Sequence, residues 1–557
     1  MSNGSRLRPL QAILVFLFAF LLLAPGIGQT PPTDRDEARF IQATKQMVET
    51  GDYVDIRFQD ESRYKKPVGI YWLQSASVQL LGGGEDASIW VYRIVSTLAM
   101  ALAGVAVLWI GGFMFGPAAG LIAAIMFIGI FGVAFEGRLA KTDSVLLLLS
   151  ILAQGFLARI YLARRDDVPP AAHWSWMFWV AQGLAILIKG PITPLLSGLT
   201  VATIVVFERG RARRWLTDLK PLRGALLALL IVAPWLVLIT WKSEGAFWQE
   251  ALGRDLFGKV AGGQELHGAP PGYYLLTYSL FVWPFGFLAL VGGSNALRRM
   301  RADARLLFCV AWYLPFFVVF EIIPTKLPHY MLPAYPAILL MGAWCLTLSE
   351  QDRYTPLLWQ RVLHGLGAFG TGVVAVGLAV VAVGLPIYLK AEFQWQGLTA
   401  AILMLLAGWF ALVNTFDLTP MRRILVAALA ASIAYCMLFA SVLPGLDRLW
   451  LNRQIAERFA EEKPCEASAL GSLSFREPSL VFLVGTDRVQ NLRPHDVAEF
   501  LEENGACGVV AISDKDATSV FASLPGGRDG MIPGGPIVGV NYSKGRELQI
   551  RLYRTKP

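Results

Sequence analysis

The chain has 557 residues, of which 55% are hydrophobic and only 16% are charged, and its mean hydropathy is +0.51. Soluble globular proteins carry about 25% charged residues, so the composition excludes a soluble fold. The net charge of +8 does not indicate a nucleic-acid partner, because much of the basic excess lies in short segments between apolar runs and no nucleic-acid-binding motif is present.

Apolar runs of about 20 residues, the length that crosses a bilayer, recur along most of the sequence. The alternation expected of a β-barrel is absent, so the spans are predicted to be helical. The pattern predicts a mainly α, polytopic membrane protein of about 13 transmembrane helices. The predicted spans are residues 11–29, 88–111, 117–135, 143–163, 174–189, 191–207, 222–241, 273–293, 305–323, 331–348, 362–386, 396–414 and 422–444.

The first apolar run follows Arg6 and Arg8. A cleaved signal peptide ending near the sequence APGIG is one interpretation. The run is long for a signal peptide, so we interpret it as the first membrane helix, with its N-terminus in the cytoplasm.

Two long polar loops separate the early and middle spans, at residues 30–87 and 242–272. The first contains the amphipathic stretches DEARFIQATKQMVETGD and PVGIYWLQSASVQLLGG. Apolar residues in the first stretch recur every three or four positions, which predicts a half-buried helix. We expect both stretches to form helices at the membrane interface.

Arginine-rich loops alternate with these polar ones. They include Arg164–Arg165, ERGRARRW at 208–215, RRMRADAR at 298–305 and Arg422–Arg423. The positive-inside rule places them in the cytoplasm with the N-terminus. Residues 30–87, 242–272 and everything after 444 are then predicted to lie outside.

Residues 445–557 differ in kind and predict a small external α/β domain beside a membrane-embedded domain of residues 1–444. The runs SLVFLVG, CGVVAIS, PIVGVNYS and LQIRLYR are typical of short strands. PHDVAEFLEENG is typical of a helix that ends at a glycine. Cys465 and Cys507 lie here, and they form either a disulfide or, since Cys507 begins a predicted core strand, unpaired buried thiols.

Acids and bases from at least six loops gather on the predicted outer side. Singly they have ordinary explanations: Lys189 can extend from a helix end to water, and Asp143 can cap a helix. Together they suit a lipid-linked phosphate held by cations beside a carboxylate base. The set comprises Asp36, Glu37, Arg39, Arg63, Tyr64, Lys65, Lys66, Glu136, Arg138, Lys141, Asp143, Lys189, Arg254, Lys259, Lys326, His329 and Tyr330.

Five motifs, in order, resemble the lipid-linked-sugar glycosyltransferases typified by the aminoarabinose transferase of lipid A. They are DRDEARFIQATKQMVETGDYV, RYKKPVGIYWLQSAS, RLAKTDSVLLLL, LAILIKGPI and TKLPHYMLPAYPA. The resemblance covers residues from about 30 to about 350. It implies the membrane-embedded GT-C fold, which this family shares with the protein mannosyltransferases.

The resemblance also implies roles for individual residues. Asp36 matches the proposed catalytic base, Glu37 is its neighbour, and Asp143 matches a second acidic position. The expected donor-phosphate ligands are Lys66, Lys189, Arg254, Lys326 and Tyr330. Lys65 stands where the family often has an acid, and Glu265 with His267 is weak evidence for zinc. We therefore predict no metal site, and a divalent metal cofactor is left open.

The implied function is transfer of a sugar, with inversion, from a polyprenyl-phosphate donor to lipid A or another envelope glycan. The expected location is the bacterial inner (cytoplasmic) membrane, with a periplasmic active site, membrane lipids as surroundings and a monomeric chain. An enzyme like the protein O-mannosyltransferases is the alternative within this class. A transporter of lipid-linked sugars is the alternative of another class.

Overall fold

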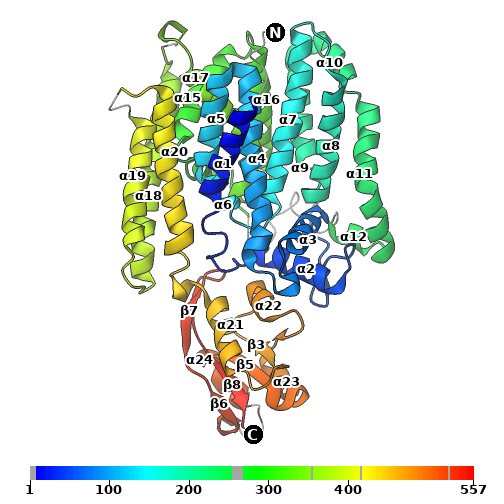
Figure 1. Cartoon of the computed structure of the whole chain (residues 1–557), viewed down its shortest axis with the longest axis vertical. Coiled ribbons are helices and arrows are strands. Elements are labelled where there is room, and N and C mark those ends of the chain that lie inside the picture. The colour runs from blue at the N-terminus through cyan, green and yellow to red at the C-terminus, as the bar shows by residue number, and fades with distance from the viewer. Residues whose placement is uncertain are drawn as a thin grey trace.

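The structure is a computed structural model that describes residues 8–251, 253, 268–352, 355–413, 417–522, 524 and 527–556. A bundle of long helices makes up most of the molecule, and a smaller unit containing a β-sheet adjoins one end of it (Figure 1). The described N-terminus and helix α10 (Ala212–Asp218) lie at the opposite end of the bundle.

Each predicted span coincides with one helix or with two successive helical segments. The bundle contains α1 (Pro9–Leu23), α4 (Ile89–Phe115), α5 (Pro117–Gly129), α6 (Phe131–Glu136), α7 (Asp143–Arg165), α8 (Ala172–Lys189), α9 (Ile192–Glu208), α11 (Pro221–Lys242), α14 (Tyr273–Phe281), α15 (Gly286–Arg299), α16 (Ala304–Ile322), the 3-10 helix η5 (Pro328–Ala334), α17 (Tyr335–Leu346), α18 (Leu358–Tyr388), α19 (Trp395–Leu412) and α20 (Pro420–Met437). The mainly helical, multi-pass fold is confirmed.

Eight helices in the described part of the chain are long and apolar enough to cross a membrane, and α1 and α5 are shorter apolar helices. The count of 13 crossings therefore stays a prediction. Fewer than 13 helices meet this length criterion because breaks shorten several of the predicted spans. The span predicted at 331–348, for example, begins as η5, which contains Pro333, and only α17 continues as a regular helix.

Two helix breaks lie against each other inside the bundle. The span predicted at 117–135 is interrupted at Ile130 and the one at 273–293 is interrupted around Pro284. The backbone N–H of Phe131 donates a hydrogen bond of 2.9 Å to the carbonyl of Trp283. Each break thus supplies the other with a backbone partner, which is required where water is absent.

Close helix contacts in the bundle depend on glycine. A Cβ atom added to Gly111 of α4 would lie 2.6 Å from the Cα of Gly120 of α5. Any larger residue at this contact would force the two helices apart. Small residues serve the same purpose in many membrane helix pairs.

The amphipathic stretches of the first polar loop form α2 (Asp36–Thr50) and α3 (Gly69–Leu81), as predicted. They lie across the end of the bundle next to the sheet-containing unit (Figure 1). Helix α2 buries Phe40, Ile41 and Met47 and ends at Gly51, whose φ of 70° is left-handed. Between the two helices lies a small hairpin of β1 (Arg57–Phe58) and β2 (Glu61–Ser62).

The C-terminal unit has a sheet of strand order β4-β3-β5-β8-β6, with β7 also paired to β8. Strands β3, β4 and β5 are parallel and β8 is antiparallel to its neighbours. Alternate residues of β5 pack into hydrophobic clusters that include helices on opposite faces. The elements are α21 (Leu451–Glu462), β3 (Ala469–Ser472), α22 (Pro478–Val484), β4 (Val489–Asn491), α23 (Val497–Asn504), β5 (Gly508–Ser513), α24 (Asp514–Ala522), β6 (Met531–Pro533), β7 (Ile537–Asn541) and β8 (Arg546–Thr555).

One strand prediction in this unit is wrong. The run SLVFLVG forms helix α22, not a strand. Pro478 occupies the first helical turn, where its fixed φ and missing N–H favour helix initiation, and Gly485 follows the last turn. A short apolar run has no periodicity that separates strand from buried helix, so the flanking residues decide.

Cys465 and Cys507, which are 42 positions apart in the sequence, form a disulfide. Of the two interpretations of these cysteines, the disulfide is confirmed. The bond ties the link after α21 to the beginning of β5.

Replacing both cysteines by serine should lower the stability of the C-terminal unit by about 2–4 kcal/mol, since the unfolded chain would regain the entropy that the closed loop removes. Thermal unfolding of the purified protein with and without a thiol reductant measures this effect. Reductant should destabilise the natural protein and leave the double variant unchanged. Equal unfolding temperatures of the two proteins without reductant would contradict a stabilising disulfide.

Candidate functional site

Five segments that are distant in sequence meet where the helical bundle adjoins the C-terminal unit. They are the start of α2, the residues before α3 that include Lys66, the link 137–142 between α6 and α7, the turn at 189–191 between α8 and α9, and residues 323–334 between α16 and α17. The contacts of their polar side chains define the candidate site.

Asp36 is the first residue of α2, and its side chain is exposed. Within the described residues its carboxylate makes no hydrogen bond or ion pair. The surrounding protein acts to raise the pKa of Asp36 by desolvation, but the positive charges of Lys141, Arg63 and Lys189 lower it further than desolvation raises it. Asp36 is therefore ionised at neutral pH and available to a substrate.

Glu37, the next residue, lies in a closed and buried network. Its carboxylate oxygens are 2.8 Å from Arg93 Nε and from Arg93 Nη2, and both side chains are only 1% exposed. The backbone N–H and hydroxyl of Thr33 and the backbone N–H of Ala140 also donate to this carboxylate. Both carboxylate oxygens of Glu37 are thus bonded within the protein, which gives this residue a structural part in the site, and its catalytic role stays a prediction.

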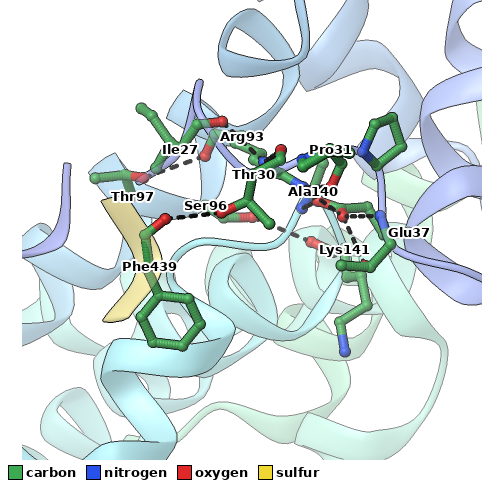
Figure 2. A network of polar contacts seen from close by, with 12 residues as sticks. Ile27, Thr30, Pro31, Glu37, Arg93, Ser96, Thr97, Ala140, Lys141 and Phe439 are labelled. Carbon is green, nitrogen blue, oxygen red and sulfur yellow. Dashed lines mark hydrogen bonds and ion pairs between the residues drawn. The ribbon is translucent and has the colours of Figure 1, made fainter. Parts of the chain in front are cut away.

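Figure 2 shows what this network holds together. Arg93 of α4 also donates hydrogen bonds to the carbonyls of Ile27, Thr30 and Pro31, in the link that leads from α1 to α2. The hydroxyl of Thr30 donates to the carbonyl of Phe439, after α20. One buried ion pair thus fixes the approach to α2, and with it the position of Asp36.

A second set of charges lies across from Asp36. Lys189 Nζ is 2.6 Å from Asp143 Oδ1, and Lys141 Nζ is 2.9 Å from Glu136 Oε2. His329 lies between the two acids, with Nε2 3.7 Å from Asp143 Oδ1 and Nδ1 3.7 Å from Glu136 Oε1. Burial lowers the pKa of His329 to about 3, so its imidazole is neutral at pH 7 despite the nearby carboxylates.

A cavity of about 290 Å³ opens beside these charges. Lys66, Lys189, Asp143, His329 and Tyr330 form its polar part, and Lys189 Nζ lies 5.4 Å from the centre of the Tyr330 ring. The rest of its wall is apolar and consists of Leu146, Pro191, Ile192, Leu195, Phe320, Ile323, Leu332 and Pro333, with Thr325 beside them. Such a cavity suits a ligand with a charged head and a hydrocarbon tail.

Lys326 does not belong to this cavity, although it comes from the same motif as His329 and Tyr330. Its Nζ donates to the carbonyls of Phe320, Glu321 and Ile323 at 2.7–2.9 Å, at the end of α16. Three bonds use all three protons of an ammonium group. In this structure Lys326 therefore stabilises the C-terminus of α16, and its role as a phosphate ligand stays a prediction.

Arg254, Lys259, Glu265 and His267 lie outside the described residues. Within the residues that the structure does describe, no group of three or more His, Cys, Asp or Glu side chains is placed to hold a metal ion.

The predicted roles were assigned without Arg93, the residue on which the position of α2 depends. The sequence contains a signal for it, since Arg93 is a charged residue inside an apolar span, where an unpaired charge would be costly. Glu136 and His329 were recognised as part of the outer cluster but given no role. The contacts of His329 with Asp143 and Glu136 depend on tertiary structure, which spacing in sequence does not give.

The C-terminal unit contacts the chain immediately before Asp36. The carboxylate of Asp34 accepts a hydrogen bond from the backbone N–H of Ser479 at 3.0 Å, and the backbone N–H of Asp34 donates to Tyr542 Oη at 2.7 Å. Burial, assisted by the negative charge of Glu477, raises the pKa of Asp34 to about 7. The Glu477 carboxylate is also 3.6 Å from Arg35 Nε.

Comparison with known proteins shows which ones this chain is similar to. Residues 65–238 match the family model of dolichyl-phosphate-mannose-protein mannosyltransferases. The undecaprenyl phosphate-alpha-4-amino-4-deoxy-L-arabinose arabinosyl transferase of Aeromonas hydrophila is 27% identical over 83% of this chain and 81% of its own length. A second arabinosyl transferase of this name, from Proteus mirabilis, is 23% identical over 70% of this chain and 69% of its own length.

The fold agrees with these relatives. ArnT from Cupriavidus metallidurans, in a crystal structure bound to undecaprenyl phosphate, superposes with a TM-score of 0.73 at 17% identity, covering 98% of both chains. This chain therefore has the same overall fold as that transferase. Helix α2, which begins with Asp36, lies at the end of the helical bundle that adjoins the C-terminal unit (Figure 1).

Glu37→Gln should destabilise the protein by about 3–5 kcal/mol, because Arg93 would keep a buried charge without its counter-ion. Asp36→Asn is the matched control, since the same chemical change one residue away removes no contact with the described protein. Thermal unfolding in detergent should show a large decrease for Glu37→Gln and little change for Asp36→Asn. A larger decrease in unfolding temperature for Asp36→Asn than for Glu37→Gln would contradict the assignment of Glu37 as a positioning residue and Asp36 as a substrate-facing one.

The part of the stability that depends on Asp34 should fall as pH rises from about 4 to about 7. The folded protein retains a proton, at a pKa of about 7, that the unfolded chain loses near its ordinary value of 3.8, so raising the pH favours unfolding over this interval. Asp34→Asn retains an oxygen for the Ser479 hydrogen bond and removes the titration. The unfolding temperature of the variant minus that of the natural protein should therefore increase with pH, and a constant difference would contradict the raised pKa.

Proposed function

We propose that this glycosyltransferase moves a sugar from a polyprenyl-phosphate donor to lipid A or a related cell-envelope glycan, with inversion at the anomeric carbon. The arabinosyl transferases to which it is similar carry undecaprenyl phosphate in their name, and the structurally similar ArnT holds undecaprenyl phosphate. Their sugar, aminoarabinose, is one candidate for this chain.

The observation that carries this proposal is the cavity with a cationic end and apolar walls. Lys66 and Lys189 line it from two different segments, and Asp36, a carboxylate without a partner in the described chain, lies within the electrostatic reach of Lys189. A polyprenyl phosphate has the matching chemistry, since its phosphate needs cations and its chain needs hydrocarbon surroundings.

The proposed step is a single displacement. An acceptor oxygen forms a bond to the anomeric carbon while the bond from that carbon to the phosphate oxygen breaks, and the electron pair leaves with the polyprenyl phosphate. Lys66 and Lys189 stabilise the second negative charge that develops on the phosphate. Asp36 accepts the proton of a hydroxyl acceptor as general base.

A phosphate acceptor changes the demand on Asp36. A phosphate monoester is largely ionised at pH 7, because its second pKa is about 6. It has little need of a base, and Asp36 would then mainly orient it and balance charge. The dependence of the reaction on Asp36 consequently reports the chemical class of the acceptor.

We place the enzyme in the bacterial inner membrane with the site and residues 445–557 in the periplasm. Two features support this orientation. The arginine-rich α10 lies at the end of the bundle away from the site, as the positive-inside rule requires. The disulfide lies in the C-terminal unit, which suits an oxidising compartment.

Transfer to a protein hydroxyl is the second candidate, and the match to the protein mannosyltransferase family model over residues 65–238 favours it. It would use the same cavity and the same donor chemistry. The two candidates differ only in acceptor, so product analysis separates them.

Purified enzyme should release polyprenyl phosphate only when both a polyprenyl-phosphate sugar and its acceptor are present. Asp36→Asn should lower kcat by about 10²–10⁴ with a hydroxyl acceptor, the usual contribution of a general base, and by much less with a phosphate acceptor. Asp60→Asn, an exposed position in the same loop, is the control and should retain full activity.

Two results would contradict the proposal. Movement of the intact donor across a vesicle membrane without release of polyprenyl phosphate would indicate a transporter. Full activity of Asp36→Asn with every accepted substrate would remove Asp36 from the mechanism.

A further inference from the structure

We infer that a second site, at the end of the bundle away from the candidate active site, binds the phosphate headgroup of an anionic phospholipid through Arg159. The inference depends on the surroundings of this arginine and on a cavity beside it. It does not depend on the reaction proposed above.

Arg159 lies in α7 within a group of aromatic rings. Its guanidinium carbon is 4.0 Å from the centre of the Phe113 ring and 5.7 Å from the centres of the Trp109 and Trp174 rings. These rings come from α4 and α8, and Phe156 of α7 packs against both tryptophans. The aromatic faces attract the cation and hold its plane in one place.

Among the described residues, no acidic side chain pairs with this arginine. In the part of the chain that the structure describes, Arg159 has no hydrogen-bond or ion-pair partner, and its Nε atom is buried without an acceptor. A buried hydrogen-bond donor without an acceptor lowers the stability of the fold and requires an explanation. A ligand that supplies oxygen atoms would provide one.

The other two arginines of α7 are different. Arg164 forms an ion pair with Asp218, and Arg165 forms one with Glu208. Arg305, across the cavity, is paired with Asp303. A general shortage of carboxylates therefore does not explain the state of Arg159.

A cavity of about 960 Å³ lies beside Arg159. Its walls are the end of α4, the start of α5, the end of α7, residues 166–171 and the turn before α16. The acids Asp166 and Asp303 also line it, and the latter is neutralised by Arg305. The volume is enough for a phospholipid headgroup with part of its glycerol.

Depth within the membrane favours a lipid over a soluble phosphate. Arg159 lies about 9 Å from the end of α7 at Arg165, given a rise of about 1.5 Å per residue. Tryptophan and a cation at this depth mark the boundary between headgroups and hydrocarbon. The planar guanidinium can donate two parallel hydrogen bonds to one phosphate, and the aromatic wall would contact the glycerol and the first methylenes of the chains.

The test is retention of lipid by the purified full-length protein, measured by native mass spectrometry after titration with phosphatidylglycerol or phosphatidylcholine. The natural protein should bind one phosphatidylglycerol more tightly than phosphatidylcholine. Arg159→Gln should weaken that binding about tenfold, which corresponds to the loss of one charge-assisted interaction. Arg213→Gln, an exposed arginine at the same end of the bundle, should bind as the natural protein does.

Arg159→Lys keeps the positive charge but loses the pair of parallel N–H donors of the guanidinium group, so it should weaken binding less than Arg159→Gln. This variant also tests the proposal if Arg159→Gln does not fold. Unchanged binding by both variants would overturn the proposal, as would equal retention of the two lipids. Glycerol phosphate added in solution should not displace the bound lipid at millimolar concentration. Displacement would assign the site to a soluble anion instead.

Discussion

The buried ion pair between Glu37 and Arg93 is the interaction on which the candidate site depends. Burying two charges costs several kcal/mol per ion unless good geometry and further hydrogen bonds offset the loss of water. Both conditions are met here, because Arg93 also binds three carbonyls of the link between α1 and α2, and Glu37 accepts bonds from Thr33 and Ala140. An apolar pair of equal volume would serve stability as well, but it would not specify where this link lies.

That specification explains why two adjacent acids have opposite environments. Successive residues of a helix point about 100° apart, so fixing Glu37 inward turns Asp36 toward the site. The bonded carboxylate of Glu37 thus positions the carboxylate of Asp36, which has no partner among the described residues. The C-terminal unit adds a second constraint from the other side, since Ser479 and Tyr542 bind Asp34.

Sequence patterns predicted the membrane helices, the two interfacial helices and three of the six strands described in the C-terminal unit, β5, β7 and β8, because hydrophobic periodicity and the positions of glycine are local properties. They also identified the segments that meet at the site. They do not give the direction in which a side chain points, and the bonds of Lys326 to three carbonyls at the end of α16 could not be predicted from its motif. Arg93 could have been found by asking what neutralises a charge within an apolar span.

Charge balance in the site bears on how the proposed reaction would be accelerated. Without substrate, Lys189 is bonded to Asp143 and Lys141 to Glu136, while the nearby His329 is neutral. A donor phosphodiester carries one negative charge and competes poorly for a lysine already bonded at 2.6 Å. As the sugar departs, the phosphate gains a second charge and competes better. A lysine that shifts from Asp143 toward the phosphate would therefore bind the transition state more strongly than the ground state, which is the condition for catalysis.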